Sequence, residues 1–169
     1  MRRAAAAIAC AVAALLAAAS GCDTAPIKVP EDASSATGGL GLRLWYARPD
    51  TRQYEFFTVD PDGTLGYGGG MKGFNREVDW RGPLTKDEAT RLREVVDAAH
   101  WLDAEKPGRE GPETTVAEVS VRAGGAERSF TINGPDDAVA RTVELLSKAA
   151  QRRFDRYMQR LPDAGVQRR

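Results

Sequence analysis

The chain has 169 residues, of which 42% are hydrophobic, and its 24 basic side chains are balanced by 24 acidic ones. This composition is typical of one globular domain and argues against a chain that binds nucleic acid through overall positive charge. Two cysteines and one histidine argue against a disulfide-dense scaffold and a cysteine-based zinc site. We therefore expect neither a metal nor a cofactor.

Residues 1–21 have the pattern of an export signal. Arg2 and Arg3 form a short positive start, residues 4–19 are apolar, and small residues precede Cys22. The apolar run is shorter than the ~20 residues that span a bilayer comfortably. The pattern therefore favours a signal peptide over a transmembrane anchor.

The small residues before Cys22 resemble the bacterial lipoprotein signal, in which such residues precede an invariant cysteine. Ala19 departs mildly from that pattern, where leucine is commoner, and an ordinary secretory signal with an incidental cysteine is the alternative. The resemblance implies that residues 1–21 are removed and that Cys22 is lipidated. The protein would then be anchored in the cell envelope, facing the periplasm or the outside of the cytoplasmic membrane. Residues 22–39 contain small polar residues and prolines but no aromatic residue, so we expect a flexible tether.

The first half of the folded part reads as four strands. Residues 40–48 alternate, with leucines on one face and Arg43 and Trp45 on the other, and residues 54–59 are aromatic and β-branched. An Asp-Pro-Asp-Gly turn ending at Gly63 leads to a partner strand at residues 64–67. We expect a fourth strand at residues 74–80, after a glycine-rich segment, and the end of the sheet at Gly82-Pro83.

The second half reads as a helix, a hairpin and a second helix. Thr85 and Glu88 form a capping-box pattern, so a helix is expected from there to about residues 100–102. Gly124-Gly125 joins two alternating strands over residues 117–132 and predicts that Val121 pairs with Arg128, Val119 with Phe130 and Ala117 with Ile132. The last helix is expected to begin at Pro135, to extend beyond a short strand's length and to end before Pro162.

The element order ββββαββα predicts an α+β domain over residues 40–161. We expect an antiparallel sheet of about five to six strands with two amphipathic helices packed on one face. Residues 162–169 would form a basic C-terminal tail.

This order is similar to that of a family of uncharacterised domains in secreted bacterial proteins. The matching features lie within residues 40–150 and are turns, caps and a hairpin: Asp62-Gly63, Tyr67-Gly68, residues 85–92 and residues 115–132. The resemblance implies the fold and an extracytoplasmic location. It implies no activity and no catalytic residues.

Local motifs that suggest chemistry have structural alternatives. The glycine-rich residues 66–73 are followed by a strand-like segment rather than a helix, so we expect an irregular turn rather than a phosphate loop. Asp60 and Asp62 lack the remaining ligands of a calcium loop, so we expect a plain turn. His100 is the only histidine, and no serine sits on a sharp nucleophile turn; we expect His100 and Trp101 to close the first helix.

Two features suggest a binding surface. Trp45 lies opposite the leucines of its strand, so it is the best candidate among the tryptophans for an exposed contact. Arg152, Arg156 and Arg160 recur every four residues on the last helix. This row is either a solvated helix face or a contact for anionic lipid headgroups or an acidic envelope partner.

We therefore expect a lipid-anchored envelope protein with a non-enzymatic binding or structural role. The alternative is an envelope hydrolase or other enzyme whose site is built from scattered carboxylates such as Glu55, Glu77 and Asp79. Converging carboxylates in a deep pocket would favour the enzyme, whereas a shallow surface would favour the binding module.

Overall fold

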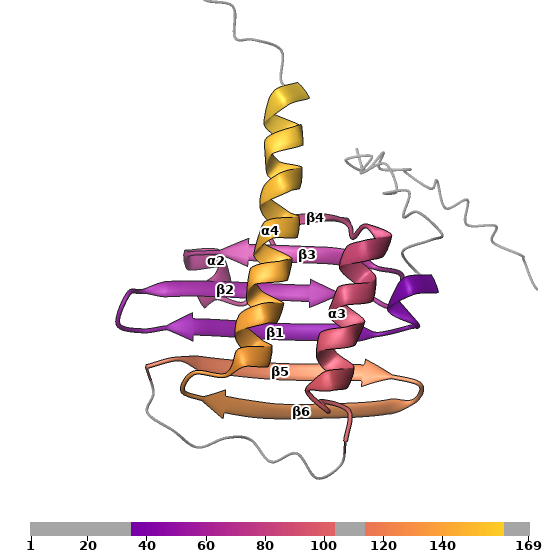
Figure 1. Ribbon diagram of the computed structural model, residues 1–169. Coiled ribbons are helices and arrows are strands. Elements are labelled where there is room, and N and C mark those ends of the chain that lie inside the picture. The colour runs from indigo at the N-terminus through magenta and orange to yellow at the C-terminus, as the bar shows by residue number, and fades with distance from the viewer. Residues whose placement is uncertain (1–34, 104–113, 161–169) are drawn as a thin grey trace, which may run out of the picture.

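The computed structural model describes residues 35–103 and 114–160, without the side chains of residues 153 and 156–160. Six strands form one antiparallel sheet in the order β4-β3-β2-β1-β5-β6. The strands are β1 (Gly41–Arg48), β2 (Gln53–Val59), β3 (Thr64–Gly69), β4 (Trp80–Pro83), β5 (Val116–Ala123) and β6 (Ala126–Asn133). The labelled helices in Figure 1 are α2 (Met71–Phe74), α3 (Lys86–Ala98) and α4 (Asp137–Arg160).

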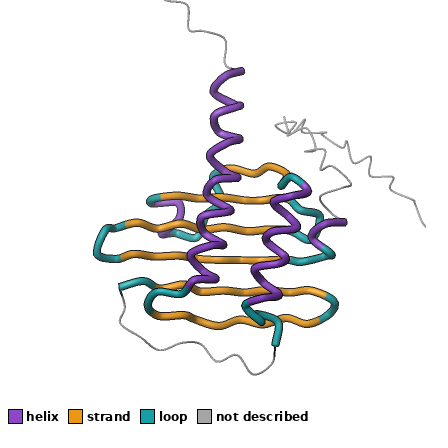
Figure 2. Tube along the Cα trace, in the orientation of Figure 1, coloured by secondary structure: helices purple, strands orange, loops and turns teal. Residues whose placement is uncertain are grey.

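The two long helices, α3 and α4, lie on the same face of the sheet, and Figure 2 shows both crossing its strands. The central strand β1 alternates as expected, so Leu42, Leu44 and Tyr46 are buried beneath the helices. This burial removes apolar surface from water and is the main source of stability. The predicted α+β architecture, with an antiparallel sheet and two helices on one face, is confirmed.

The helix α3 begins at the predicted capping box. The Thr85 hydroxyl accepts a hydrogen bond from the Glu88 backbone N–H at 3.3 Å, and the Glu88 carboxylate accepts one from the Thr85 backbone N–H at 2.6 Å. The helix ends at Ala98, slightly before the expected end, and His100 has a φ of 56°. This turn directs Trp101 into the core, where it is fully buried as expected.

The hairpin of β5 and β6 has the predicted two-residue link and register. Gly124 and Gly125 have φ values of 57° and 84°, which is the left-handed region that such a tight turn requires. The cross-strand pairs are Val121 with Arg128, Val119 with Phe130 and Ala117 with Ile132.

The helix α4 begins two residues after its expected start at Pro135. The Asp136 carboxylate accepts hydrogen bonds of 3.0 Å from the backbone N–H groups of Ala138 and Val139, so Asp136 caps the helix. In Figure 1 the C-terminal turns of α4 extend beyond the edge strand β4, as the length of the apolar stripe predicts. Near that end, the Phe154 side chain is 56% exposed.

The expected strand at residues 74–80 is wrong. In its place, a segment that includes α2 crosses the sheet face opposite α3 and α4 (Figure 1). We call this segment, residues 70–79, the strap. A Cβ at Gly68 would collide with the backbone carbonyl oxygen of Glu77, so glycine is what lets the strap lie directly on β3.

The sheet also continues past its expected end. Gly82 and Pro83 belong to β4 and pair with Leu65 and Thr64 of β3. The strand β4 is at the edge of the sheet, where the missing N–H of proline costs no ladder hydrogen bond.

The folded part begins before Leu40. Residues 35–39, which the sequence assigns to the tether, lie against the domain. Thr37 is fully buried, and its hydroxyl donates a 2.8 Å hydrogen bond to the carbonyl oxygen of Pro61 in the β2–β3 turn.

Candidate binding cleft

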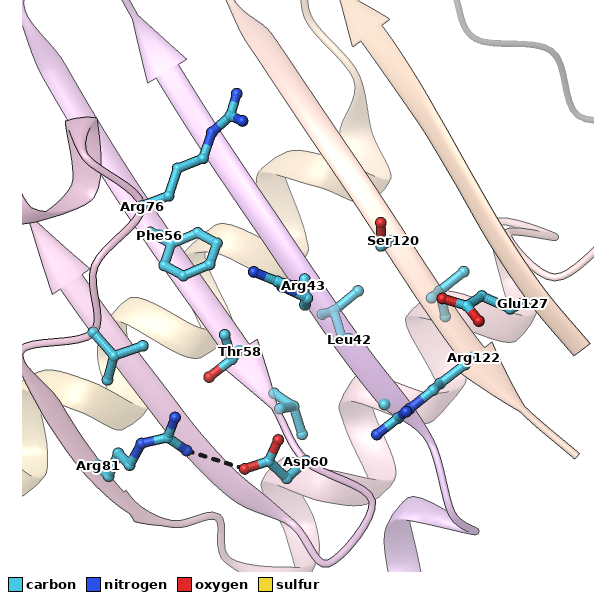
Figure 3. Close-up of a pocket in the computed structure, with 14 residues that line it drawn as sticks. Leu42, Arg43, Phe56, Thr58, Asp60, Arg76, Arg81, Ser120, Arg122 and Glu127 are labelled. Atoms are coloured by element: carbon cyan, nitrogen blue, oxygen red, sulfur yellow. Dashed lines mark hydrogen bonds and ion pairs between the residues drawn. The ribbon is translucent and has the colours of Figure 1, made fainter. Parts of the chain in front are cut away.

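The sheet face opposite α3 and α4 carries a cleft of about 520 Å³ (Figure 3). The strap and β4 form one wall, the β5–β6 hairpin forms the other, and β1 and β2 supply the floor. The polar side chains of most interest in its lining are Arg43, Thr58, Arg76, Arg81, Ser120 and Arg122.

A row of polar side chains crosses the floor of this cleft. Thr58 of β2 pairs with Arg43 of β1, Arg43 pairs with Ser120 of β5, and Ser120 pairs with Ser129 of β6. Residues directly opposite one another in antiparallel strands point to the same face. The row therefore places Arg43 between Thr58 and Ser120 on the neighbouring strands, and the Ser120 and Ser129 oxygens lie 2.6 Å apart.

The Thr58 hydroxyl is buried at one end of this row. Its oxygen has no hydrogen-bond partner among the residues that the structure describes. The next position in the row is Gly66, and a Cβ there would collide with this oxygen. Leaving a buried hydroxyl unpaired costs about 1–3 kcal/mol, so this contact with Gly66 lowers the stability of the sheet.

Two of the four arginines in the cleft are held by carboxylates. Arg76 of the strap lies 2.6 Å from the Glu118 carboxylate of β5, and Arg81 of β4 lies 3.1 Å from Asp60. Both pairs are exposed, so each stabilises the fold by at most about 1 kcal/mol. They do neutralise much of the charge of these two guanidinium groups.

Arg43 and Arg122 have no carboxylate within ion-pair distance in the described ranges. The guanidinium carbon of Arg43 lies 5.8 Å from the centre of the Phe56 ring. The Arg122 side chain lies along Gly41, where a Cβ would come within 2.7 Å of its Nε. Glu127 is opposite Arg122 in register and lines the cleft, but it forms no ion pair with Arg122.

The arrangement can hold an anion. Figure 3 shows Arg81 and Arg122 extending from opposite walls with Asp60 between them, and Arg43 further along the floor of the cleft. Guanidinium groups present a planar set of donors that matches oxyanions. The part of the chain that the structure describes contains no group of three His, Cys, Asp or Glu residues arranged to hold a metal ion.

Trp45 lies on this same sheet face, as its alternation predicts, and is half-buried. Its indole N–H donates a 3.0 Å hydrogen bond to the carbonyl oxygen of Gly73, and the Arg76 guanidinium lies 4.9 Å from its ring centre. Trp45 therefore holds the strap in place. On α2, the side chains of Met71 and Phe74 are 72% and 50% exposed.

The predicted arginine row has a structural role at its first position. Arg152 forms an ion pair with Glu88, the same almost fully buried carboxylate that caps α3. Arg152 therefore links the two long helices. The side chains of Arg156 and Arg160 lie outside the described residues, and so does Cys22.

The carboxylates proposed for an enzymatic site do not converge. Glu55 faces α4, where its carboxylate accepts a 3.3 Å hydrogen bond from the Ser147 hydroxyl. Glu77 lies on the other side of the sheet, in the strap, and forms a 2.5 Å ion pair with Lys72. Asp79 is the last residue of the strap. The sheet therefore separates the carboxylates of Glu77 and Asp79 from that of Glu55.

His100 follows the end of α3 by two residues, close to its predicted position. Its Nδ1 lies 3.1 Å from the Asp103 carboxylate, and both side chains are exposed. The Asp60–Gly63 segment is likewise the predicted turn, with a 2.8 Å hydrogen bond from the Gly63 N–H to the Asp60 carbonyl oxygen.

Glu55 is a buried carboxyl group on the helix side of the sheet. Burial raises its pKa above the ordinary range, while the hydrogen bond from Ser147 and the positive charge of Arg48 oppose that shift. Burial also raises the pKa of the nearby Tyr67, and the negative charge of Glu55 adds to it. One Glu55 oxygen, Oε2, has no hydrogen-bond partner among the described residues.

Sequence reasoning did not single out Arg43, Arg122, Thr58 and Ser120 as a site. The alternation of β1 and of the hairpin already placed Arg43 and Ser120 opposite the core. The strand order could not be predicted from the sequence, because β1 and β5 are far apart in the chain and become neighbours only in the folded sheet.

No protein-family model matches this sequence, and no curated protein is significantly similar to it. Within residues 35–103 and 114–160, no helix is long and apolar enough to cross a membrane.

Proposed function

We propose that this protein is a lipid-anchored binding module of the bacterial cell envelope, without enzymatic activity, that holds its ligand on the sheet face opposite α3 and α4. The observation that carries this proposal is the cleft beside the strap. There Arg43 and Arg122 lack acidic partners among the described residues. The signal pattern before Cys22 supports the anchored location.

A binding role fits the construction of this face. The glycines of β3 allow the strap to form a wall, and Trp45 fixes the strap through its hydrogen bond to Gly73. A rigid wall reduces the ordering cost that a ligand would otherwise bear on binding. Glu55 and Glu77, two of the carboxylates considered for an enzymatic site, lie on opposite sides of the sheet.

The test is site-specific photo-crosslinking in native envelopes. A photoreactive residue at Ser129 would report on the cleft, and one at Glu94 on α3 would report on the opposite side as a matched exposed control. We expect an adduct of discrete mass from position 129 and none from position 94. Absence of any adduct from position 129, or equal adducts from both positions, would contradict the proposed binding face.

A further inference from the structure

We propose that the cleft binds a phosphoryl group, which Arg43 and Arg122 hold together with the hydroxyl of Ser120. This inference rests on the proposed function, because it names the chemistry of the ligand on the same sheet face. It covers inorganic phosphate and phosphate esters, since both present the same group to the cleft.

The charge of the site fits such a group. The lining contains four arginines and two carboxylates, Asp60 and Glu127. Asp60 is already paired with Arg81, whereas no described carboxylate pairs with Arg43 or Arg122. A phosphate monoester carries about −1.5 to −2 charges at neutral pH, which two guanidinium groups can balance.

The cleft offers more hydrogen-bond donors than a carboxylate ligand has oxygens to accept. Two guanidinium forks and the hydroxyl of Ser120 supply donors from the two neighbouring strands β1 and β5. A carboxylate has two oxygens in one plane, whereas a phosphoryl group directs three terminal oxygens outward from a tetrahedral centre. Donors that approach from different strands therefore match the phosphoryl group better.

Both arginines are placed before a ligand arrives. Arg43 lies over Phe56, and a cation above an aromatic face is attracted to it. Arg122 lies along Gly41, which leaves room for the side chain because it has no Cβ. This placement lowers the side-chain entropy lost on binding.

The experiment is an NMR titration of the full chain in a neutral detergent, with four probes at equal ionic strength: inorganic phosphate, glycerol 3-phosphate, acetate and glycerol. We expect saturable shifts of the Arg43 and Arg122 Nε–H signals with both phosphoryl probes and none with glycerol. Stronger binding of glycerol 3-phosphate would identify an ester as the source, and equal binding would identify the free oxyanion as sufficient.

The variants locate the binding. Arg43→Gln and Arg122→Gln are each expected to weaken phosphate binding about tenfold, the effect of losing about 1.4 kcal/mol. Arg43→Lys keeps the charge without the planar fork and should lie between Gln and wild type. Arg128→Gln is the matched control, because Arg128 pairs with Val121 and so projects from the helix side; its affinity should stay within about twofold of wild type.

Gly41→Ala is a second test of the role of Arg122 in phosphate binding. The added methyl would displace Arg122 without changing any charge, so binding should weaken while Arg43 signals still respond. Equal saturation by acetate, absence of shifts with phosphate, or wild-type affinity in both Gln variants would overturn the inference. If one of these results came together with a crosslink from Ser129, the phosphoryl inference would fail, but the proposal that this face binds a ligand would still hold.

Discussion

The buried carboxyl of Glu55 illustrates how strand pairing decides the environment of a single residue. Its β2 position places it beneath α4, where Ser147 donates to one oxygen and the other has no partner in the described part of the chain. Burial of this group favours its neutral form and raises its pKa. Glu55 is therefore a contact between sheet and helix whose strength depends on pH.

We predict that stability falls as the pH rises above the ordinary range of a carboxyl. The folded state keeps the Glu55 proton to a higher pH than the unfolded chain does, so ionisation in this window favours unfolding. Glu55→Gln should flatten this dependence and stabilise the protein by about 1 kcal/mol at pH 8, since no charge is then buried. Urea unfolding of both proteins at pH 5 and pH 8 measures this.

Glu144→Gln is the matched control, because Glu144 is an exposed carboxyl on the same helix and pairs with Lys148. It should leave the difference between pH 5 and pH 8 close to that of wild type. Equal changes in stability between pH 5 and pH 8 for wild type and Glu55→Gln would contradict the assignment.

At the scale of elements, the strap is the part of the fold that the sequence did not reveal. Residues 74–80 alternate well enough to predict a strand, but alternation does not show whether a partner strand is within reach. The deciding contact is between Gly68 and the carbonyl of Glu77, which are far enough apart in the chain to leave no local signal. The sequence shows the glycines of β3, but it does not show that the backbone of the strap packs directly on them.

We predict that Gly68→Ala destabilises the protein by about 1–3 kcal/mol, the usual cost of forcing extra volume into a packed site. Its methyl would collide with the backbone of the strap, which has no alternative rotamer to adopt. Gly41→Ala on the same sheet face should cost much less, because its methyl meets only the flexible Arg122 side chain. Thermal or urea unfolding of the two variants compares them directly, and equal stability would show that the strap does not depend on Gly68.

At the scale of the whole molecule, the α+β architecture followed from patterns that are local in the sequence. The capping box at Thr85, the Gly124-Gly125 link and the alternation of β1 each constrain a few neighbouring residues, and each is present in the structure. The candidate cleft depends instead on which strands lie side by side. Arg43 meets Ser120 only because the hairpin adds to the edge of β1, and no single segment encodes that choice.

We predict that a membrane anchor at Cys22 sets where this domain works. The apolar run of residues 4–19 is shorter than the ~20 residues that span a bilayer comfortably, so membrane attachment would rest on acyl chains. One acyl chain binds only marginally, whereas two or more hold a protein firmly. Cys22→Ser should therefore move the protein from the membrane pellet to the soluble fraction, or leave it as an unprocessed precursor.

The chain offers a matched control in Cys10, the other cysteine, which lies inside the apolar run. Cys10→Ser should leave processing and fractionation unchanged, because the lipoprotein pattern assigns no role to that position. Immunoblots of membrane and soluble fractions, with the apparent mass of each species, separate the two variants. Normal processing and full membrane retention of Cys22→Ser would show that something other than a lipid on this cysteine anchors the domain. Loss of retention in Cys22→Ser alone would support lipid attachment at Cys22.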